Sequence, residues 1–180
     1  ALLWKKEVGA DLTSVAFSPN GRTVAAGCMN NAVYLFDTES RSMQVLRGHR
    51  DQVLDVVFSK DGARLASTSQ DNDIRVWELP SGRSQSIRPL EGGGISLDLS
   101  PDGKLLAMGG NDGTVRLWDL ERRRQQAGLH GHQGVVYTVR FSPDGSLLAS
   151  GAADGAVRLW DVEKGRQRKV LQAHEAAILS

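Results

Sequence analysis

The stretch FSPDGSLLASGAADGAVRLWD, residues 141–161, contains the signals that decide the fold of this chain. Its apolar and small residues alternate or run for five or six positions between Gly, Pro and Asp, which is typical of short β-strands. Ser-Pro-Asp-Gly at 142–145 fits a type I turn with proline at its second position. Asp154-Gly155, like Asp112-Gly113, fits a two-residue hairpin turn with positive φ. The stretch therefore predicts three strands joined by two tight turns.

The same pattern recurs four times along the 180 residues. The first turn appears as FSPNG, FSKDG, LSPDG and FSPDG at 17–21, 58–62, 99–103 and 141–145. A second anchor, an aromatic residue followed by an acid, keeps the same period as LFD, VWE, LWD and LWD at 35–37, 76–78, 117–119 and 159–161. Each repeat ends in a looser loop and a polar fourth strand, such as RQRKVLQ at 166–172, as expected of an outer edge. Two motifs that recur with the same period in four copies indicate a repeat architecture.

Composition argues against several classes of protein. The 22 basic and 21 acidic residues give a net charge of +1, which is too balanced to favour nucleic acid or an anionic membrane surface. No apolar run approaches the ~20 residues of a transmembrane helix, and the first residues do not follow the order of a signal peptide. Cys28 is the single cysteine, so no internal disulfide forms. We expect no membrane partner and, on the weak ground of cysteine usage, a cytoplasmic location.

These residues resemble the WD-repeat family of β-propellers, and the resemblance extends over the whole chain. Repeats two and four carry it best, with Gly-His before the first strand, Asp in the second turn and Trp followed by an acid. Repeat three lacks the histidine but keeps NDGTVRLWD at 111–119, and repeat one is degenerate. The resemblance implies an all-β propeller of four-stranded antiparallel blades, with about four blades present of a probable seven or more.

The resemblance also implies where the blades begin and end within the propeller segment 1–180. In this family the sequence repeat opens with the outer strand of one blade and continues with the inner strands of the next. We therefore expect residues 1–8 to be the outer strand of a preceding blade and residues 174–180 to start a following one. The four blades between them are expected at 9–48, 49–89, 90–131 and 132–173. Missing blades of a parent chain, or self-association, would then cover the ends.

In this family, a histidine, a serine or threonine, an aspartate and a tryptophan form a buried hydrogen-bonded tetrad. The matching residues are His49, Ser67, Asp71 and Trp77 in blade two, and His132, Ser150, Asp154 and Trp160 in blade four. Blade three keeps a partial tetrad of Asp112 and Trp118 beside Leu90 and Met108, and blade one has Val8, Ala26, Asn30 and Phe36.

The same three residue types, His, Ser and Asp, also build hydrolase sites. A nucleophilic serine needs an exposed oxygen and an oxyanion hole, and the chain has no Gly-x-Ser-x-Gly elbow. A set that occurs twice at identical spacing is better explained by the repeat. We therefore interpret the tetrads as structural and expect no catalytic residues and no enzyme activity.

Other candidate chemistries are weaker. The histidines at 49, 130, 132 and 174 lack the further Cys or His residues that complete a metal site, and EGGG at 91–94 lacks the Lys-Ser/Thr of a phosphate loop. We expect no metal and no cofactor. ERRRQQ at 121–126 and KGRQRK at 164–169 are basic, but no aromatic residues interleave to stack bases. A solvated rim is therefore favoured over nucleic-acid binding.

The resemblance places partner binding where the loop before each inner strand meets the following hairpin turn. By spacing from the histidine position, the exposed residues are Asp11, Thr13, Met29, Gln52, Leu54, Gln70, Gly93, Ile95, Asn111, Val135, Tyr137 and Ala153. Leu54, Ile95 and Tyr137 would form an apolar ridge, and tyrosine is well suited to anchor a partner. The alternative is that Leu54 and Ile95 pack between blades.

The function that follows is a non-catalytic scaffold that binds proteins or peptides as part of a larger WD-repeat propeller. One alternative is a sensing or regulatory propeller segment of a larger multidomain enzyme, such as a signalling kinase or an ATPase. A second, weaker alternative is a nucleic-acid-associated scaffold that uses the basic rim.

Overall fold

Four antiparallel sheets make up the computed structural model, which describes residues 7–87, 92–172 and 176–179. Each sheet contains four strands that pair in chain order, and we call the sheets blades one to four. Blade one contains β1 (Leu12–Phe17), β2 (Thr23–Cys28), β3 (Ala32–Asp37) and β4 (Met43–Arg47). Blade two contains β5 (Val53–Phe58), β6 (Arg64–Ser69), β7 (Ile74–Glu78) and β8 (Arg83–Ile87). Blade three contains β9 (Gly94–Leu99), β10 (Leu105–Gly110), β11 (Val115–Asp119) and β12 (Arg124–Leu129). Blade four contains β13 (Val136–Phe141), β14 (Leu147–Ala152), β15 (Ala156–Asp161) and β16 (Arg166–Gln172).

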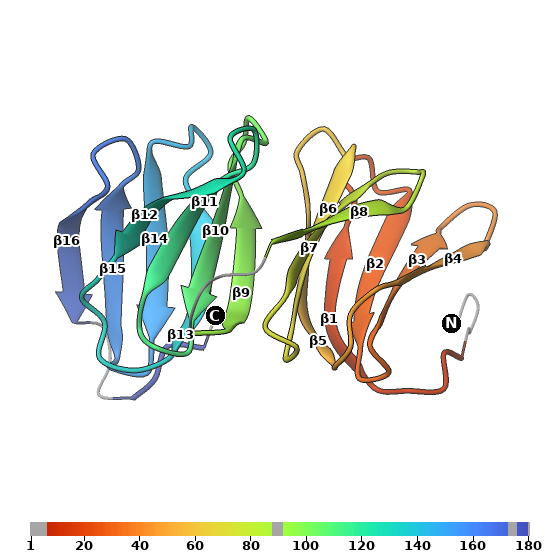
Figure 1. Cartoon of the computed structure of the whole chain (residues 1–180), viewed down its shortest axis with the longest axis horizontal. Helices are drawn as coiled ribbons and strands as arrows, with labels where there is room; N and C mark the ends of the chain where they lie inside the picture. The colour runs from red at the N-terminus through yellow and green to blue at the C-terminus, as the bar shows by residue number, and fades with distance from the viewer. Residues whose placement is uncertain (1–6, 88–91, 173–175, 180) are drawn as a thin grey trace.

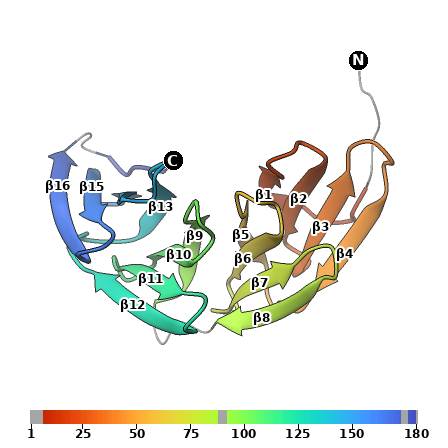
Figure 2. The ribbon, with the colours of Figure 1, turned by 90° about the horizontal axis from the view of Figure 1, so that it is seen from above.

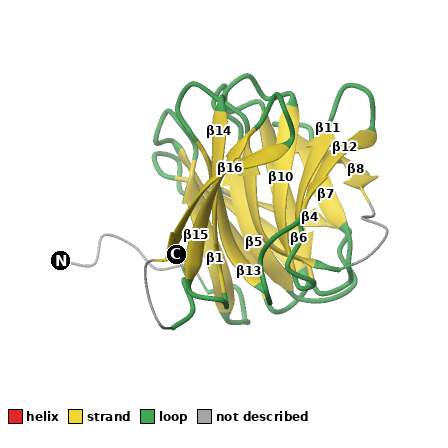
Figure 3. Ribbon diagram, turned by 90° about the vertical axis from the view of Figure 1, so that its left-hand side faces the viewer, coloured by secondary structure: helices red, strands yellow, loops and turns green. Residues whose placement is uncertain are grey.

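The blades stand side by side in chain order along an arc (Figures 1 and 2). The first strand of each blade, β1, β5, β9 and β13, lies on the inner side of the arc, and the fourth strand lies on the outer side (Figure 2). The loops gather at the two ends of the strands, and no helix is drawn among the described residues (Figure 3). The predicted all-β propeller architecture is therefore confirmed, as four blades that do not close into a ring.

The first turn of every blade has the same hydrogen bonds. In blade four the Gly145 N–H donates to the carbonyl of Ser142 at 2.8 Å, which closes the predicted type I turn. The Ser142 hydroxyl donates to the Asp144 carboxylate. This bond, aided by donors from Ser146, lowers the pKa of Asp144 to about 2. The equivalent serines, Ser18, Ser59 and Ser100, make the same contact with Asn20, Asp61 and Asp102.

The second turn differs from the two-residue hairpin that the sequence suggested. Only one residue of each turn has positive φ, namely Asn31 (68°), Asn72 (59°), Gly113 (77°) and Gly155 (71°), whereas the residue before it, Asn30 in blade one and an aspartate in the others, does not. The Gly155 N–H donates to the carbonyl of Ala152 at 3.1 Å, so the turn is a type I turn that ends in a left-handed residue. That prediction was wrong because Asp-Gly fits both geometries, and only the second leaves the aspartate at negative φ.

Adjacent blades pack through three apolar clusters, one at each interface between blades. Between blades one and two, for example, Ala25, Val33 and Leu35 contact Val53 and Val56. All of these side chains are buried. Burying apolar side chains of this size contributes about 1.5–3 kcal/mol each, so these interfaces are the main stabilising feature of the arc.

Residues of complementary size meet at one repeated position in each interface. A Cβ atom on Gly27 would lie only 2.8 Å from Cγ1 of Val53, and one on Gly109 would lie 2.9 Å from Cγ1 of Val136. Between blades two and three the sizes are exchanged, because Thr68 stands at the small position and faces Gly94. The Thr68 hydroxyl also donates to the Gly94 carbonyl at 3.0 Å. Each interface therefore accepts one branched side chain at this point.

Aspartates on the inner strands link the blades by hydrogen bonds. The Asp55 carboxylate accepts from the Ser14 hydroxyl of blade one at 2.8 Å and from the Leu97 N–H of blade three at 2.9 Å. Asp98 accepts from the Phe141 N–H of blade four at 2.7 Å, and burial raises the pKa of this carboxyl. These links hold the inner strands in register across the arc.

Candidate functional site

The four predicted tetrad residues of blade two meet in a buried chain of hydrogen bonds. The indole N–H of Trp77 donates to Ser67 Oγ at 2.8 Å, and Ser67 Oγ lies 2.8 Å from His49 Nε2. His49 Nδ1 lies 3.2 Å from Oδ2 of Asp71. Because the serine oxygen already accepts from the indole, its own proton is free to donate to Nε2. The imidazole proton is then on Nδ1 and donates to Asp71.

Blade four repeats this arrangement. Trp160 donates to Ser150 Oγ at 2.8 Å, Ser150 Oγ lies 2.7 Å from His132 Nε2, and His132 Nδ1 lies 3.0 Å from Oδ1 of Asp154. Arg158 Nε also lies 3.3 Å from His132 Nδ1. Both of these nitrogens carry a proton in the tautomer above, so we interpret this contact as packing. The guanidinium of Arg158 faces Asp154 at 3.5 Å.

Burial determines the charge of these groups. It lowers the pKa of both His49 and His132 and outweighs the neighbouring carboxylates, so the imidazoles are neutral at pH 7. Burial alone would raise the pKa of Asp71 and Asp154. Donors that include the backbone N–H groups of Arg50 and Gln133, together with the histidines, hold both pKa values below the ordinary aspartate value.

The serine oxygens are shielded from solvent. The exposed fraction is 0% for Ser67 and 1% for Ser150, and each hydroxyl is bonded on both sides. A substrate could reach such an oxygen only if the blade opened. The arrangement is therefore suited to satisfy buried polar groups, which a closed hydrogen-bond chain does well.

Blade three uses a different pairing for its aspartate. Met108 stands at the serine position, and Leu90, which stands at the histidine position, lies outside the described residues. Asp112 forms a bidentate pair with Arg116, in which Nη1 donates to Oδ1 at 3.0 Å and Nη2 donates to Oδ2. The indole N–H of Trp118 is buried and has no hydrogen-bond partner in the described part of the chain. An arginine therefore pairs with the aspartate that a histidine contacts in blades two and four.

Blade one replaces the polar set by aromatic packing. Asn30 Nδ2 donates to the hydroxyl oxygen of Tyr34 at 2.9 Å, and the rings of Tyr34 and Phe36 stack with centroids 6.2 Å apart. Ala26 stands at the serine position and is buried. Val8, at the histidine position, packs together with Phe36 against the buried cluster of Cys28, Ala32 and Tyr34.

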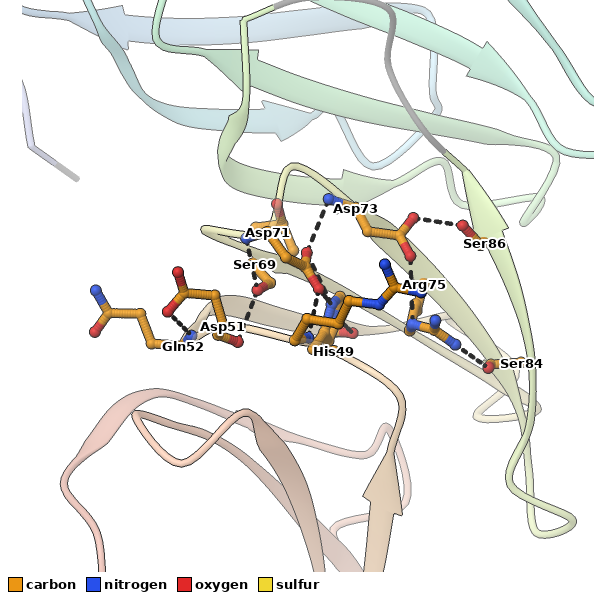
Figure 4. Close-up of polar contacts among 12 residues, drawn as sticks. His49, Asp51, Gln52, Ser69, Asp71, Asp73, Arg75, Ser84 and Ser86 are labelled. Atoms are coloured by element: carbon orange, nitrogen blue, oxygen red, sulfur yellow. Dashed lines mark hydrogen bonds and ion pairs between the residues drawn. The ribbon is translucent and has the colours of Figure 1, made fainter.

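Sequence reasoning missed the arginine that stands two residues before the tryptophan in blades two, three and four. In blade two the Arg75 guanidinium donates to Ser84 Oγ at 3.0 Å and faces Asp73 (Figure 4). It also lies over the ring of Trp77, 5.8 Å from the ring centroid. It packs closely on Gly48, where a Cβ atom would lie 2.6 Å from Nη1. The signal was present as Arg-x-Trp in three repeats, and it explains why glycine precedes His49.

The predicted partner-binding residues come together in pairs in every blade. The Met29 N–H donates to the Asp11 carbonyl at 3.0 Å and the Gln70 N–H to the Gln52 carbonyl at 3.0 Å. Equivalent bonds join Asn111 to Gly93 at 3.2 Å and Ala153 to Val135 at 2.9 Å. We call the surface formed by these four pairs, together with Leu54, Ile95 and Tyr137, the loop face.

Loops of neighbouring blades adjoin across the loop face. A Cβ atom on Gly93 of blade three would lie 2.6 Å from Oδ1 of Asn72 of blade two. One on Gly113 would lie 2.8 Å from the His132 carbonyl of blade four. The loops beside these pairs therefore adjoin between blades two and three and between blades three and four.

Side chains of the loop face differ in how much of their surface is exposed to solvent. Met29 is 52% exposed, and Asp11, Gln70 and Asn111 are exposed. Leu54, Ile95 and Tyr137 are half-buried, as are Gln52 and Val135, and the described apolar clusters between blades do not include the three ridge residues. The Thr13 hydroxyl, by contrast, donates to the Val53 carbonyl of blade two and is committed to that contact.

The repeats match a known protein family. The family model described as "WD domain, G-beta repeat" matches residues 7–37, 40–78, 84–119 and 123–161. The chain belongs to the WD40 repeat family. The second, third and fourth WD40 matches span the outer strand of one blade and the three inner strands of the next. WD40 repeats in general indicate a protein-interaction scaffold. A comparison with curated proteins finds no match.

The other candidate sites have structural explanations within the WD40 blades. Gly92 and Gly93 have positive φ, and a Cβ atom on Gly92 would lie 2.5 Å from the Asp112 carboxyl carbon. An anion would therefore meet negative charge there. His130 is exposed, and His174 lies outside the described residues. Among residues 7–87, 92–172 and 176–179, no three His, Cys, Asp or Glu side chains gather as a metal site requires. Cys28 is buried, and burial raises the pKa of its thiol.

The basic segments lie at the outer side of the WD40 arc. Residues 121–126 are exposed, as are residues 164–169 apart from the half-buried Gly165, and both segments lie in or beside β12 and β16. Part of their charge is paired, because Arg122 contacts Asp119 at 2.8 Å and Lys164 lies 3.6 Å from Asp161. In the described part of the chain, no helix has the length and apolar character needed to cross a membrane.

Proposed function

We propose that this WD40 chain is a non-catalytic scaffold that binds proteins or peptides across its loop face. The observation that carries the proposal is the set of four equivalent backbone hydrogen bonds, from Met29, Gln70, Asn111 and Ala153, which fixes the same two loops of each blade side by side. The backbone of this surface is thereby rigid, and pre-organised surfaces lose less entropy when they bind.

The chemistry of the loop face supports an extended peptide as ligand. Half-buried Leu54, Ile95 and Tyr137 offer apolar area with little side-chain freedom left to lose, and Gln52, Gln70 and Asn111 around them can donate and accept hydrogen bonds. Aromatic anchors surrounded by polar groups are typical of binding hot spots. We expect Tyr137 to contribute most.

A peptide library displayed on phage tests the proposal. Peptides enriched on the wild-type chain should bind about tenfold or more weakly to Tyr137→Ala. They should bind normally to Gln126→Ala, a matched control on the exposed outer strand β12. Enriched peptides that bind both variants alike, or that need β12 and β16, would contradict the loop face as the binding surface.

Absence of catalysis is tested separately. Broad esterase and peptidase substrates should show no turnover that disappears in Ser67→Ala or Ser150→Ala, because both oxygens are buried and hydrogen-bonded. Turnover that depends on either serine would overturn the structural interpretation of the tetrads.

A further inference from the structure

A groove lies between each pair of neighbouring blades. Its volume is about 370 Å³ between blades one and two, about 530 Å³ between blades two and three, and about 370 Å³ between blades three and four. Each groove is lined by the start of the second strand of one blade and by the turn between the third and fourth strands of the next. In an antiparallel blade these segments lie at the end opposite to the second turn, which belongs to the loop face.

The three grooves differ in charge. Two aspartates and no basic side chain of the described chain line the first groove, and three acidic side chains and one basic side chain line the third. The middle groove is lined instead by Arg64, Arg83 and Arg123, with Glu78 and Glu121. Blades two and three stand in the middle of the arc (Figure 2), so both walls of this groove are complete blades. Positive charge therefore exceeds negative charge in the middle groove alone among the three.

Arg64 brings one of these charges to the border between the blades. It begins β6, and the residues in the same register at the start of β2 and β10 are Thr23 and Leu105, which are uncharged. The Arg64 Nη1 donates to the Gly103 carbonyl of blade three at 3.3 Å. Its guanidinium is thereby held between the two blades.

Arg123 supplies a second charge from the opposite wall. It stands in the turn between β11 and β12 with a φ of 54°, where the turns of blades two and four have Gly82 (72°) and Gly165 (58°). A Cβ atom on Gly82 would lie 3.1 Å from Nε2 of Gln44, on the outer strand of the preceding blade. A side chain at this turn position therefore starts against that strand. Arg123 and Gln85 of β8 accordingly line the middle groove together.

The charges of the middle groove are available to a ligand. Arg64, Arg83 and Arg123 are exposed. The side chains of Arg83 and Arg123 form no hydrogen bond and no ion pair within the described part of the chain. Part of the negative charge is offset, because Lys104 Nζ lies 3.9 Å from Oε1 of Glu121. Planar guanidinium groups of this kind are suited to bind carboxylates through two parallel hydrogen bonds.

We propose that the groove between blades two and three binds an acidic peptide segment of a partner protein, whose Asp or Glu carboxylates contact Arg64, Arg83 and Arg123. This site goes beyond the function proposed above, because it lies at the other end of the blades from the loop face. The side chains of Val76 and Leu120 also line the groove and offer apolar contact to residues between the acids.

A peptide fits this groove better than a nucleic acid does. The two glutamates would repel the continuous charge of a phosphate backbone, whereas a peptide can carry its carboxylates at intervals that avoid them. No aromatic side chain is among the residues that line the groove in the described chain, so no base could stack there.

A peptide library displayed on phage and selected on the Tyr137→Ala chain tests the proposal, since this variant lacks the expected anchor of the loop face and keeps the groove. Enriched peptides should be rich in Asp and Glu. Adding Arg64→Glu and Arg123→Glu should weaken their binding about tenfold or more, because like charges then face each other. Adding Arg41→Glu and Lys169→Glu, which change exposed residues outside the three grooves, should leave binding unchanged. This control is matched in net charge, and Arg41 also has positive φ (60°).

Two results would overturn the proposal: a selection that yields no acidic peptides, or acidic peptides that bind both double variants alike. Neither result bears on the loop face, whose own test depends on Tyr137. A single-stranded oligonucleotide is the second probe. If it binds more tightly than the peptides and needs the same arginines, the groove is a nucleic-acid site and the proposal is wrong. Circular dichroism shows whether each variant is folded, and Arg64→Ala with Arg123→Ala replaces the glutamate pair if that pair does not fold.

Discussion

Blades three and four are adjacent and share a sequence pattern, yet the equivalent aspartate has different hydrogen-bond partners in the two blades. In blade four, Asp154 accepts from a neutral histidine that belongs to a buried chain with Ser150 and Trp160. In blade three, Asp112 is paired with Arg116, and the Trp118 N–H has no hydrogen-bond partner among the described residues. Both blades pack on their neighbours through similar apolar clusters. We infer that blade-to-blade packing fixes the position of a blade, and we expect the tetrad to add stability to it.

The largest difference between blades is expected when the aspartate is removed. Asp154→Ala should destabilise the chain by roughly 1–3 kcal/mol, because the buried His132 and the Gln133 N–H lose their shared acceptor. Asn30→Ala, the equivalent change in blade one, should cost clearly less, since Asn30 is exposed, donates to the Tyr34 hydroxyl and more weakly to the Val8 carbonyl, and has no histidine at the equivalent position. Urea unfolding monitored by tryptophan fluorescence gives both free energies. Equal losses would show that the tetrad has no effect specific to its blade.

A smaller effect is expected from the tryptophans. Trp160→Phe and Trp118→Phe remove the same atoms from blades four and three, but of these two indoles only that of Trp160 donates a hydrogen bond to a described residue. The Trp160 variant should therefore lose about 1 kcal/mol more than the Trp118 variant. Trp77→Phe should behave like Trp160→Phe, because its indole donates to Ser67. If the Trp118 variant is the least stable of the three, hydrogen bonding does not account for the difference between blades.

Sequence reasoning reached the blades and the tetrad residues because both depend on local, repeated signals. It could not reach the bidentate pairing of Asp112 with Arg116, because an arginine stands at this position in blade four as well, where Arg158 lies 3.5 Å from Asp154 beside His132. The sequence also does not show that Thr68 faces Gly94 where a glycine faces a valine in the other two interfaces. These residues belong to different blades and meet only when the blades pack. The Asp-Gly turns were assigned the wrong type because their residues fit two turn geometries.

The smallest expected effect is the change of folding stability with pH. The folded chain holds His49 and His132 below their ordinary pKa, so the unfolded chain binds more protons as the pH falls past about 6.5. The contribution of these neutral histidines is complete above that pH and is lost as the pH falls toward their folded pKa. Asp71 and Asp154, whose pKa values are also lowered, act in the same direction below about pH 4.

Stability measured between about pH 7.5 and 5.5 should therefore fall in the wild-type chain. The fall should be shallower in the double variant His49→Gln, His132→Gln, which has no imidazole to protonate at these positions. Guanidinium unfolding at each pH provides the free energies. A wild-type chain that gains stability over this range would mean that the histidines are charged in the fold.

The protonation of His49 and His132 tests the central claim most directly, because the proton position defines the direction of the hydrogen-bond chain. Nitrogen-15 chemical shifts of the imidazoles at pH 7 report which nitrogen carries the proton. We expect both histidines to be neutral with the proton on Nδ1, facing Asp71 and Asp154, and with Nε2 accepting from Ser67 and Ser150. A proton on Nε2, or a charged imidazolium, would contradict the tetrads as described and with them the structural role assigned to blades two and four.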